Sequence, residues 1–198
     1  MLISVSSQAQ LDTLRRLPII AVDMGFSSRT ASCGYAFRSG HSSQTVSGNK
    51  KFNECLRAVA TQISDCKELL LILEAPLSAA FDQPGNPQPR GEFERAPKPR
   101  WWSLGAGAAM SLAAMYFLQG IVKTVSAECR CHLIEGFVVG ADSGNDADVA
   151  ETLISCCAGE RECSWKSPQS PKLVSVINWV EPHASPAPAP IVLIPTFA

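Results

Sequence analysis

The sequence has almost no net charge and very few histidines. Its 17 basic residues nearly balance its 18 acidic residues, which gives a formal charge of −1. This balance does not by itself indicate a nucleic-acid partner, so binding to phosphate would require a local basic patch. The three histidines, His41, His132 and His183, are scattered and form no catalytic pattern. With no internal repeat either, any function must be read from individual motifs.

The N-terminus lacks a charged segment followed by an apolar core and a cleavage site, so we expect no secretory signal and a cytoplasmic protein. Eight cysteines are nevertheless present. A chain of 198 residues with 46% hydrophobic residues can bury a core without disulfides, so we expect reduced cysteines, several of them buried. Cys129, Cys131 and His132 resemble half of a zinc site, but the other cysteines complete no known ligand spacing.

Apolar periodicity predicts one α/β domain at residues 18–160, between a helical extension at 1–17 and a C-terminal extension at 161–198 with a Pro/Ala-rich tail. The expected strands are 18–23, 30–37, 41–46, 69–74 and 132–139, and the expected helices are 6–16, 49–66, 104–125 and 145–158. The first three strands follow one another closely, which favours an antiparallel meander. The helix before residues 69–74 favours parallel pairing of that strand with the first.

The remaining segments show weaker patterns. Residues 75–103 are rich in proline and predict a long loop, and 160–171 predict a polar loop. Residues 172–180 alternate like a half-exposed strand, and 191–194 predict an edge strand or a contact with a partner chain. Residues 104–125 carry no charge up to residue 122, which is also typical of a membrane span. Glycine and alanine in the first half favour a helix buried in protein, so we expect no membrane association.

Acidic residues stand at three informative places. Asp23 ends the apolar run 18–23 and is followed by glycine, and Glu74 ends the apolar run 69–73. Asp146 and Asp148 open the apolar helical pattern 145–158. If the two strands are parallel neighbours, their C-terminal ends bring Asp23 and Glu74 side by side. The helix would add a third carboxylate, and such a cluster is typical of a divalent-metal site.

The order of these elements, with acids after the first and fourth strands and at the last helix, resembles the ribonuclease H-like superfamily. Within it the chain looks most like the RuvC-type nucleases and the related DUF429-like predicted nucleases. The segments that carry the resemblance are 19–27 (IIAVDMGFS), 71–77 (LILEAPL) and 145–150 (NDADVA). The resemblance implies an α/β fold with a mixed sheet of about five strands flanked by helices. It also implies a nuclease that acts on DNA or RNA with Mg²⁺ or Mn²⁺.

Phosphodiester hydrolysis requires an activated water and a stabilised leaving oxygen, and two divalent ions about 4 Å apart supply both. Asp23, Glu74 and Asp148 are the predicted catalytic residues, and with Asp146 they are the predicted metal ligands. Asp146 and Asp148 lie about 200° apart around a helix, so both cannot face one site. Asp148 is the first choice, with Asp146 in reserve.

Two further acids are candidates for completing the site. Asp142 precedes the helix as a second reserve ligand. Glu135 lies on the next strand, 132–139.

Each acid also has a simpler explanation. Asp23 could hold the following turn through backbone N–H groups, and Glu74 could merely end its strand. Asp146 and Asp148 could complement the helix dipole behind Asn145, which is a good N-terminal cap. These simpler roles remain open at this stage.

The predicted substrate contacts are Arg100, Trp101 and Trp102, which could grip a phosphate and stack on a base. The two tryptophans could instead fill the core at the start of the long helix. Two other functions remain open besides the nuclease. One is a non-catalytic scaffold or homodimer. The other is an actin-like phosphotransferase, because residues 22–28 also resemble its first phosphate motif, although the chain has no second motif of that kind.

Overall fold

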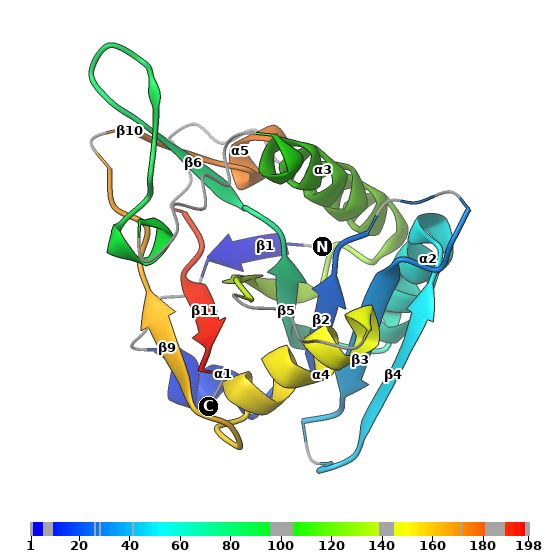
Figure 1. Ribbon diagram of the computed structural model, residues 1–198. Helices are drawn as coiled ribbons and strands as arrows, with labels where there is room; N and C mark the ends of the chain where they lie inside the picture. The colour runs from blue at the N-terminus through cyan, green and yellow to red at the C-terminus, as the bar shows by residue number, and fades with distance from the viewer. Residues whose placement is uncertain are drawn as a thin grey trace.

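The computed structural model describes residues 2–5, 10–25, 27, 29–40, 42–95, 105–138, 145–170, 172–180 and 189–196. Its centre is a mixed sheet of eight strands (Figure 1). In spatial order these are β4 (Thr45–Lys50), β3 (Cys33–Arg38), β2 (Ile19–Asp23), β5 (Glu68–Glu74), β8 (Arg130–Gly136), β11 (Val192–Pro195) and β9 (Cys163–Lys166), and β1 (Leu2–Val5) also pairs with β8.

The pairing confirms the predicted meander and the predicted parallel step. Strands β2, β3 and β4 are antiparallel neighbours, whereas β2, β5 and β8 are parallel neighbours. The α/β class with a mixed sheet flanked by helices is therefore confirmed. The expected count of five strands is wrong, because three short strands from outside residues 18–160 join the same sheet.

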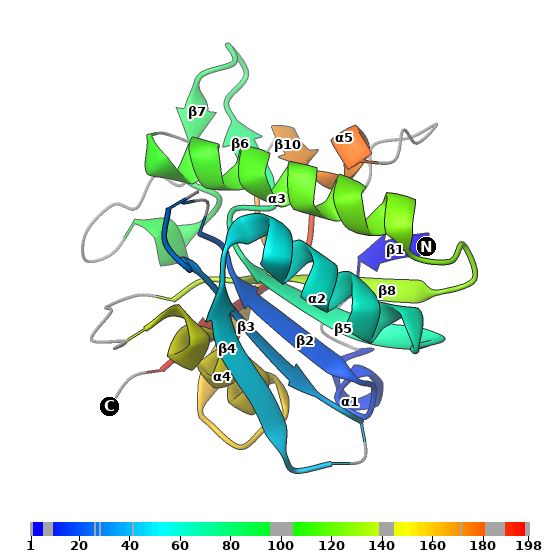
Figure 2. The ribbon, with the colours of Figure 1, turned by 90° about the vertical axis from the view of Figure 1, so that its right-hand side faces the viewer.

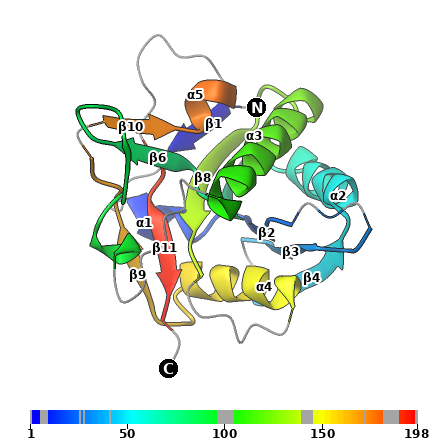
Figure 3. The same cartoon turned by 45° about the horizontal axis from the view of Figure 1, so that its top comes forward.

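Helices cover both faces of the sheet. Helices α2 (Phe52–Ser64) and α3 (Ala106–Thr124) lie on one face, and α4 (Asp146–Cys157) lies on the other with the short α1 (Leu11–Leu14) (Figures 2 and 3). Alternate residues of β2 divide between two apolar clusters. Ile20 and Val22 pack in the cluster of α2 and α3, and Ile19 and Ala21 pack in that of α4. The sheet is thus buried on both sides, as the continuously apolar strands predicted.

A second, smaller sheet corrects the prediction of a loop at residues 75–103. It consists of β10 (Lys172–Ser175), β6 (Ser78–Phe81) and β7 (Pro87–Gln88), followed by a 3₁₀ turn at Glu92–Glu94. The Asp82 carboxylate closes the β6–β7 hairpin by accepting N–H bonds from Gly85 and Asn86, and Gly85 takes a φ of 97°. This proline-rich segment therefore contains a β-hairpin that its sequence did not predict. Residues 177–180, expected as strand, form the short helix α5 (Ile177–Val180).

Both segments that flank residues 18–160 contribute to the main sheet. Strand β1 pairs with the first half of β8, and β11 pairs with its second half. Strand β11 lies between β8 and β9, so the expectation of an edge strand at 191–194 is wrong. Strand β9 also replaces part of the polar loop expected at 160–171. Short strands of four residues give too little periodicity for detection from sequence.

Helix α3 is less buried than the sequence predicted. Its residues Ala114, Phe117, Leu118 and Ile121 are buried, but Leu112 and Tyr116 on another side are each 63% exposed. By length and composition alone α3 is a candidate membrane span, with a mean hydropathy of 1.2. The expectation of a helix enclosed by protein therefore holds for one face only. The exposed face borders the first turns of α2, and the two helices are in contact (Figure 2).

Candidate functional site

Asp23 and Glu74 are direct neighbours in the sheet. The two residues oppose each other in the parallel register of β2 and β5, where adjacent strands lie about 4.8 Å apart. Side chains alternate along a strand, and the even residues Leu70 and Ile72 of β5 pack with α4. Asp23 and Glu74 therefore both point to the α4 face, and both are partly buried. The structure brings these two predicted site residues together.

The N-terminus of α4 closes on this position because Gly34 has no side chain. Gly34 opposes Asp23 in the register of β3. A Cβ atom at Gly34 would lie 1.9 Å from the carbonyl oxygen of Asp146. The helix start therefore rests directly on the strand next to Asp23.

The N-terminus of α4 is also capped and tied to β4. The side-chain oxygen of Asn145 accepts N–H bonds from Ala147 at 2.8 Å and from Asp148 at 3.2 Å. The Asn49 amide of β4 donates to the same oxygen at 3.3 Å. This cap gives a hydrogen-bond acceptor to two backbone N–H groups in the first turn of the helix. It also fixes the helix rotation that sets which of its first acids faces the sheet.

Asp146, rather than Asp148, lies beside Asp23. The pKa of Asp23 rises from 3.8 to about 7, first because burial disfavours the charged carboxylate and second because of the negative charge of Asp146. Burial also raises the pKa of Asp146. Asp148 is exposed and lines a separate hollow with Glu151 and Arg161. The reserve ligand of the sequence analysis is thus the one that the fold brings to Asp23.

Glu135 lies on the opposite face of the sheet. It opposes Leu73 of β5, and that face packs against α2 and α3. Its carboxylate is completely buried and receives two bonds of 2.6 Å from the Arg90 guanidinium. The N–H group of Leu77 donates to it as well, at 2.8 Å. Glu135 is therefore engaged in a structural ion pair and does not join Asp23 and Glu74.

Arg90 is the centre of a buried polar network that the sequence did not reveal. Its side chain is 2% exposed and bonds Glu135, Glu94 and the Ser78 hydroxyl. Burial raises the pKa of Glu135, and the positive charge of the adjacent Arg90 guanidinium acts in the opposite direction by lowering that pKa. The network ties the small sheet and the 3₁₀ turn to β8. The remaining predicted residues Asp142, Arg100, Trp101 and Trp102 lie outside the described residues.

One histidine does form a hydrogen-bonded series. The Ser4 hydroxyl lies 3.1 Å from Nδ1 of His132, and Nε2 of His132 lies 2.7 Å from Glu68. The sequence did not predict this series, because the pairing of β1 with β8 was not foreseen. Ser4 lies within a strand, whereas nucleophilic serines of α/β-hydrolases sit on sharp strand-to-helix turns. We assign the series the structural role of joining β1, β8 and β5.

Replacing Gly34 with Ala is expected to displace the start of α4 and with it Asp146. The new methyl group would meet backbone atoms that cannot rotate away, so a loss of about 1–3 kcal/mol in the free energy of unfolding is expected. Urea unfolding measures this loss. Gly48→Ala on β4 is the matched control, because its Cβ would meet only the Tyr35 ring at 3.4 Å. Equal stabilities of the two variants would contradict the close approach at Gly34.

No protein-family model and no curated protein matches the sequence. The geometry of Asp23, Glu74 and Asp146 therefore carries the functional argument.

Proposed function

We propose that the protein is a metal-dependent nuclease that hydrolyses phosphodiester bonds of DNA or RNA, with a site related to that of the ribonuclease H-like RuvC-type enzymes. The observation that carries the proposal is the placement of Asp23 and Glu74 on adjacent parallel strands beneath the α4 terminus that holds Asp146. Three acids from three separate elements lie near one end of the sheet, with Asp146 and Glu74 on either side of Asp23. A role in a turn or a cap does not require the three to lie at the same end.

The donor set fits Mg²⁺ or Mn²⁺. All three side chains offer carboxylate oxygens, which these hard cations prefer. Among the described residues no three acidic, histidine or cysteine side chains already surround a single point. Mg²⁺ commonly binds through one or two carboxylates and retains several waters, so Asp23 and Asp146 suffice for one ion. Glu74, on the β5 side of Asp23, would hold a second ion.

The electrostatics of the site also favour a cation. Asp23 and Asp146 are partly withdrawn from water, and the negative charge of Asp146 opposes ionisation of Asp23. A bound divalent ion supplies the Lewis acid that activates water and stabilises the leaving oxygen in phosphodiester hydrolysis. The carboxylates would orient that ion, and they must be deprotonated to do so. Because protonation of Asp23 competes with the ion, metal affinity should fall as the pH drops below about 7.

Incubation of the purified chain with end-labelled DNA and RNA oligonucleotides tests the proposal. We expect cleavage with Mg²⁺ or Mn²⁺ and none with a chelator. We also expect Mn²⁺ to raise the unfolding temperature more at pH 8 than at pH 5.5, which reports binding independently of activity. If neither ion supports degradation of any substrate, the nuclease proposal fails. The non-catalytic scaffold considered from the sequence would then replace it.

A further inference from the structure

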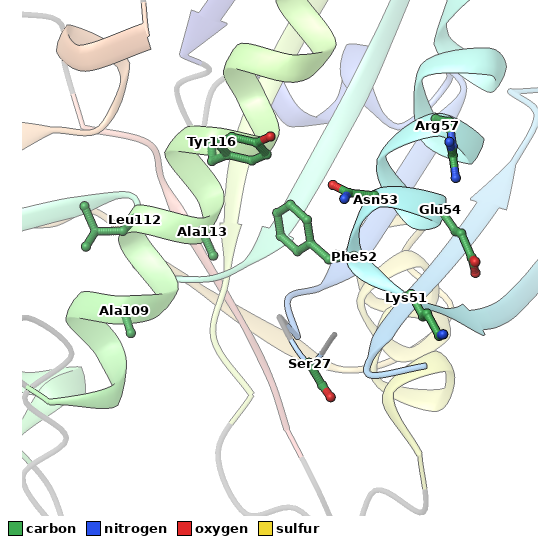
Figure 4. Close-up of a pocket in the computed structure, with 10 residues that line it drawn as sticks. All are labelled: Ser27, Lys51, Phe52, Asn53, Glu54, Arg57, Ala109, Leu112, Ala113 and Tyr116. Atoms are coloured by element: carbon green, nitrogen blue, oxygen red, sulfur yellow. The ribbon is translucent and has the colours of Figure 1, made fainter. Parts of the chain in front are cut away.

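A groove runs between α2 and α3, on the face of the sheet opposite to the carboxylate site. Its first part has a volume of about 720 Å³, and the residues that line it include Ser27, Lys51, Phe52, Glu54, Arg57 and Tyr116 (Figure 4). A second part continues along the same two helices as far as Lys123 and Thr124 and shares Asn53, Arg57 and Tyr116 with the first. We call these two parts together the α2–α3 groove. Its wall on α3 spans residues 109–124, about 22 Å of helix.

An aromatic platform stands in the middle of the groove. The Tyr116 ring is 63% exposed and lies 6.0 Å from the Phe52 ring, measured between centroids. Phe52 in turn packs edge to face on the buried Phe117 at 5.8 Å. Figure 4 shows Tyr116 and Phe52 facing the space between the helices. The exposed ring is therefore backed by a fixed one, which suits stacking against a flat ligand.

The groove carries more positive than negative charge. Lys51, Arg57 and Lys123 line it against one acid, Glu54. All three cations are exposed, and within the described part of the chain none of them forms an ion pair. The chain as a whole is nearly neutral, so this local excess is the basic patch that phosphate binding requires.

The groove opens at the sheet end that holds the carboxylates. Ser27 follows Asp23 by four residues and lines the opening with Lys51. Lys51 directly follows β4, whose last residues oppose the start of β3 beside Asp23. Helices α2 and α4 lie on opposite faces of the sheet (Figure 2), so the groove lies on the α2 face of this end and the carboxylates on its α4 face. A nucleic-acid strand that leaves the groove at Lys51 thus reaches the end of the sheet at which Asp23 and Glu74 lie.

We infer that the α2–α3 groove binds a single strand of nucleic acid, with phosphates along Lys51, Arg57 and Lys123 and an unpaired base stacked on Tyr116. This inference rests on the proposed nuclease function for its substrate class. Bases in a duplex already stack on one another, so an isolated exposed ring can accept only an unpaired base. Cations spaced along a groove beside an aromatic platform are the arrangement that holds single strands without sequence preference.

Fluorescence anisotropy of a labelled 12-nucleotide strand tests the inference, with Asp23→Asn as the parent so that cleavage does not intervene. We expect DNA or RNA single strands to bind and a blunt duplex to bind more weakly. Adding Tyr116→Ala should weaken binding roughly fivefold to a hundredfold, whereas Tyr116→Phe should retain it. Adding Arg57→Gln should reduce the salt slope of log K by about 0.7.

Matched controls lie outside the groove. Trp179→Ala removes another exposed aromatic ring, and Lys166→Gln removes another exposed cation, so neither should change binding. Thermal unfolding confirms that each variant is folded. Absence of single-strand binding at 50 mM salt, or equal affinities of Tyr116→Ala and its parent, would overturn the inference. Preference for the duplex would overturn it equally.

The outcome is separable from that of the nuclease assay. Binding that depends on Tyr116 without any metal-dependent cleavage would support the groove and refute the nuclease. Cleavage that is unaffected by Tyr116→Ala would support the nuclease and refute the groove.

Discussion

Asp23→Asn is expected to abolish metal-dependent cleavage while making the metal-free protein more stable at pH 8. Asparagine keeps the shape of the side chain but removes the charge that would hold the ion, so the rate should fall on the order of a thousandfold or more. The same change removes a partly buried charge that lies beside Asp146. Loss of activity and gain of stability from one substitution distinguish a functional acid from a structural one.

The pH dependence of this gain has a definite sign. The pKa of Asp23 is about 7 in the folded protein against 3.8 in the unfolded chain, so the folded state binds the proton more tightly. Stability is therefore lost as the pH rises from about 4 to 7, and the Asn variant does not titrate there. The stabilising effect should vanish near pH 4 and reach at most about 4 kcal/mol at pH 8.

Urea unfolding at pH 4, 6 and 8 measures the stability of parent and variant, and oligonucleotide cleavage measures activity. Asp65→Asn is the matched control, because Asp65 is exposed at the end of α2 and should change neither property. A destabilised Asp23→Asn at pH 8 would indicate that this carboxylate serves the turn that follows it. Retained cleavage would exclude Asp23 from the catalytic site.

Arg90→Met is expected to have the largest effect on stability, a loss of about 3–5 kcal/mol at pH 8. The substitution leaves Glu135 and Glu94 buried without their cation, and an unpaired buried charge is strongly unfavourable. Burial already places the pKa of Glu135 above its ordinary value of 4.5, and loss of Arg90 would raise that pKa further. The destabilisation should therefore grow with pH and be smaller at pH 5, where protonation relieves the charge.

Denaturant unfolding at both pH values checks this expectation. Arg95→Met provides the control, because Arg95 is 57% exposed and its pair with the exposed Glu92 should contribute less than about 1 kcal/mol. A second variant, Arg90→Met combined with Glu135→Gln, should recover part of the loss at pH 8. A change below 1 kcal/mol for Arg90→Met alone would contradict the buried network.

The sequence predicted the parts of the site that depend on strand patterns. Asp23 and Glu74 end long apolar runs, and a single connecting helix makes those runs parallel neighbours, so their meeting could be foreseen. The choice between Asp146 and Asp148 could not be predicted from the sequence. Both lie in the first turn of α4, and the contact of Gly34 with the helix backbone, together with the Asn49–Asn145 bond, selects Asp146. Such a contact between distant segments leaves no periodic signal.

Register explains the other differences. Glu135 follows apolar residues of β8, as Asp23 and Glu74 follow those of β2 and β5, but its position in the alternation turns it to the opposite face. Glu135 opposes the residue before Glu74, and this shift of one residue in the register cannot be predicted from the sequence without knowing how the strands pair. Arg90 lies in a proline-rich stretch with no apolar period, so neither its burial nor its two acidic partners could be anticipated. Long-range pairing, rather than local preference, decides these positions.

The pairing of β1 and β11 with the two halves of β8 has a consequence for the order of folding. Leu2 pairs with Arg130 along one half of this strand, and Val192 pairs with Glu135 along the other. These pairs join residues 128 and 57 positions apart, since 130 − 2 = 128 and 192 − 135 = 57. Contacts of such long sequence separation slow folding, because the entropy of closing the intervening chain opposes them. Until residue 192 leaves the ribosome, half of a central strand remains open to pairing with a neighbouring nascent chain.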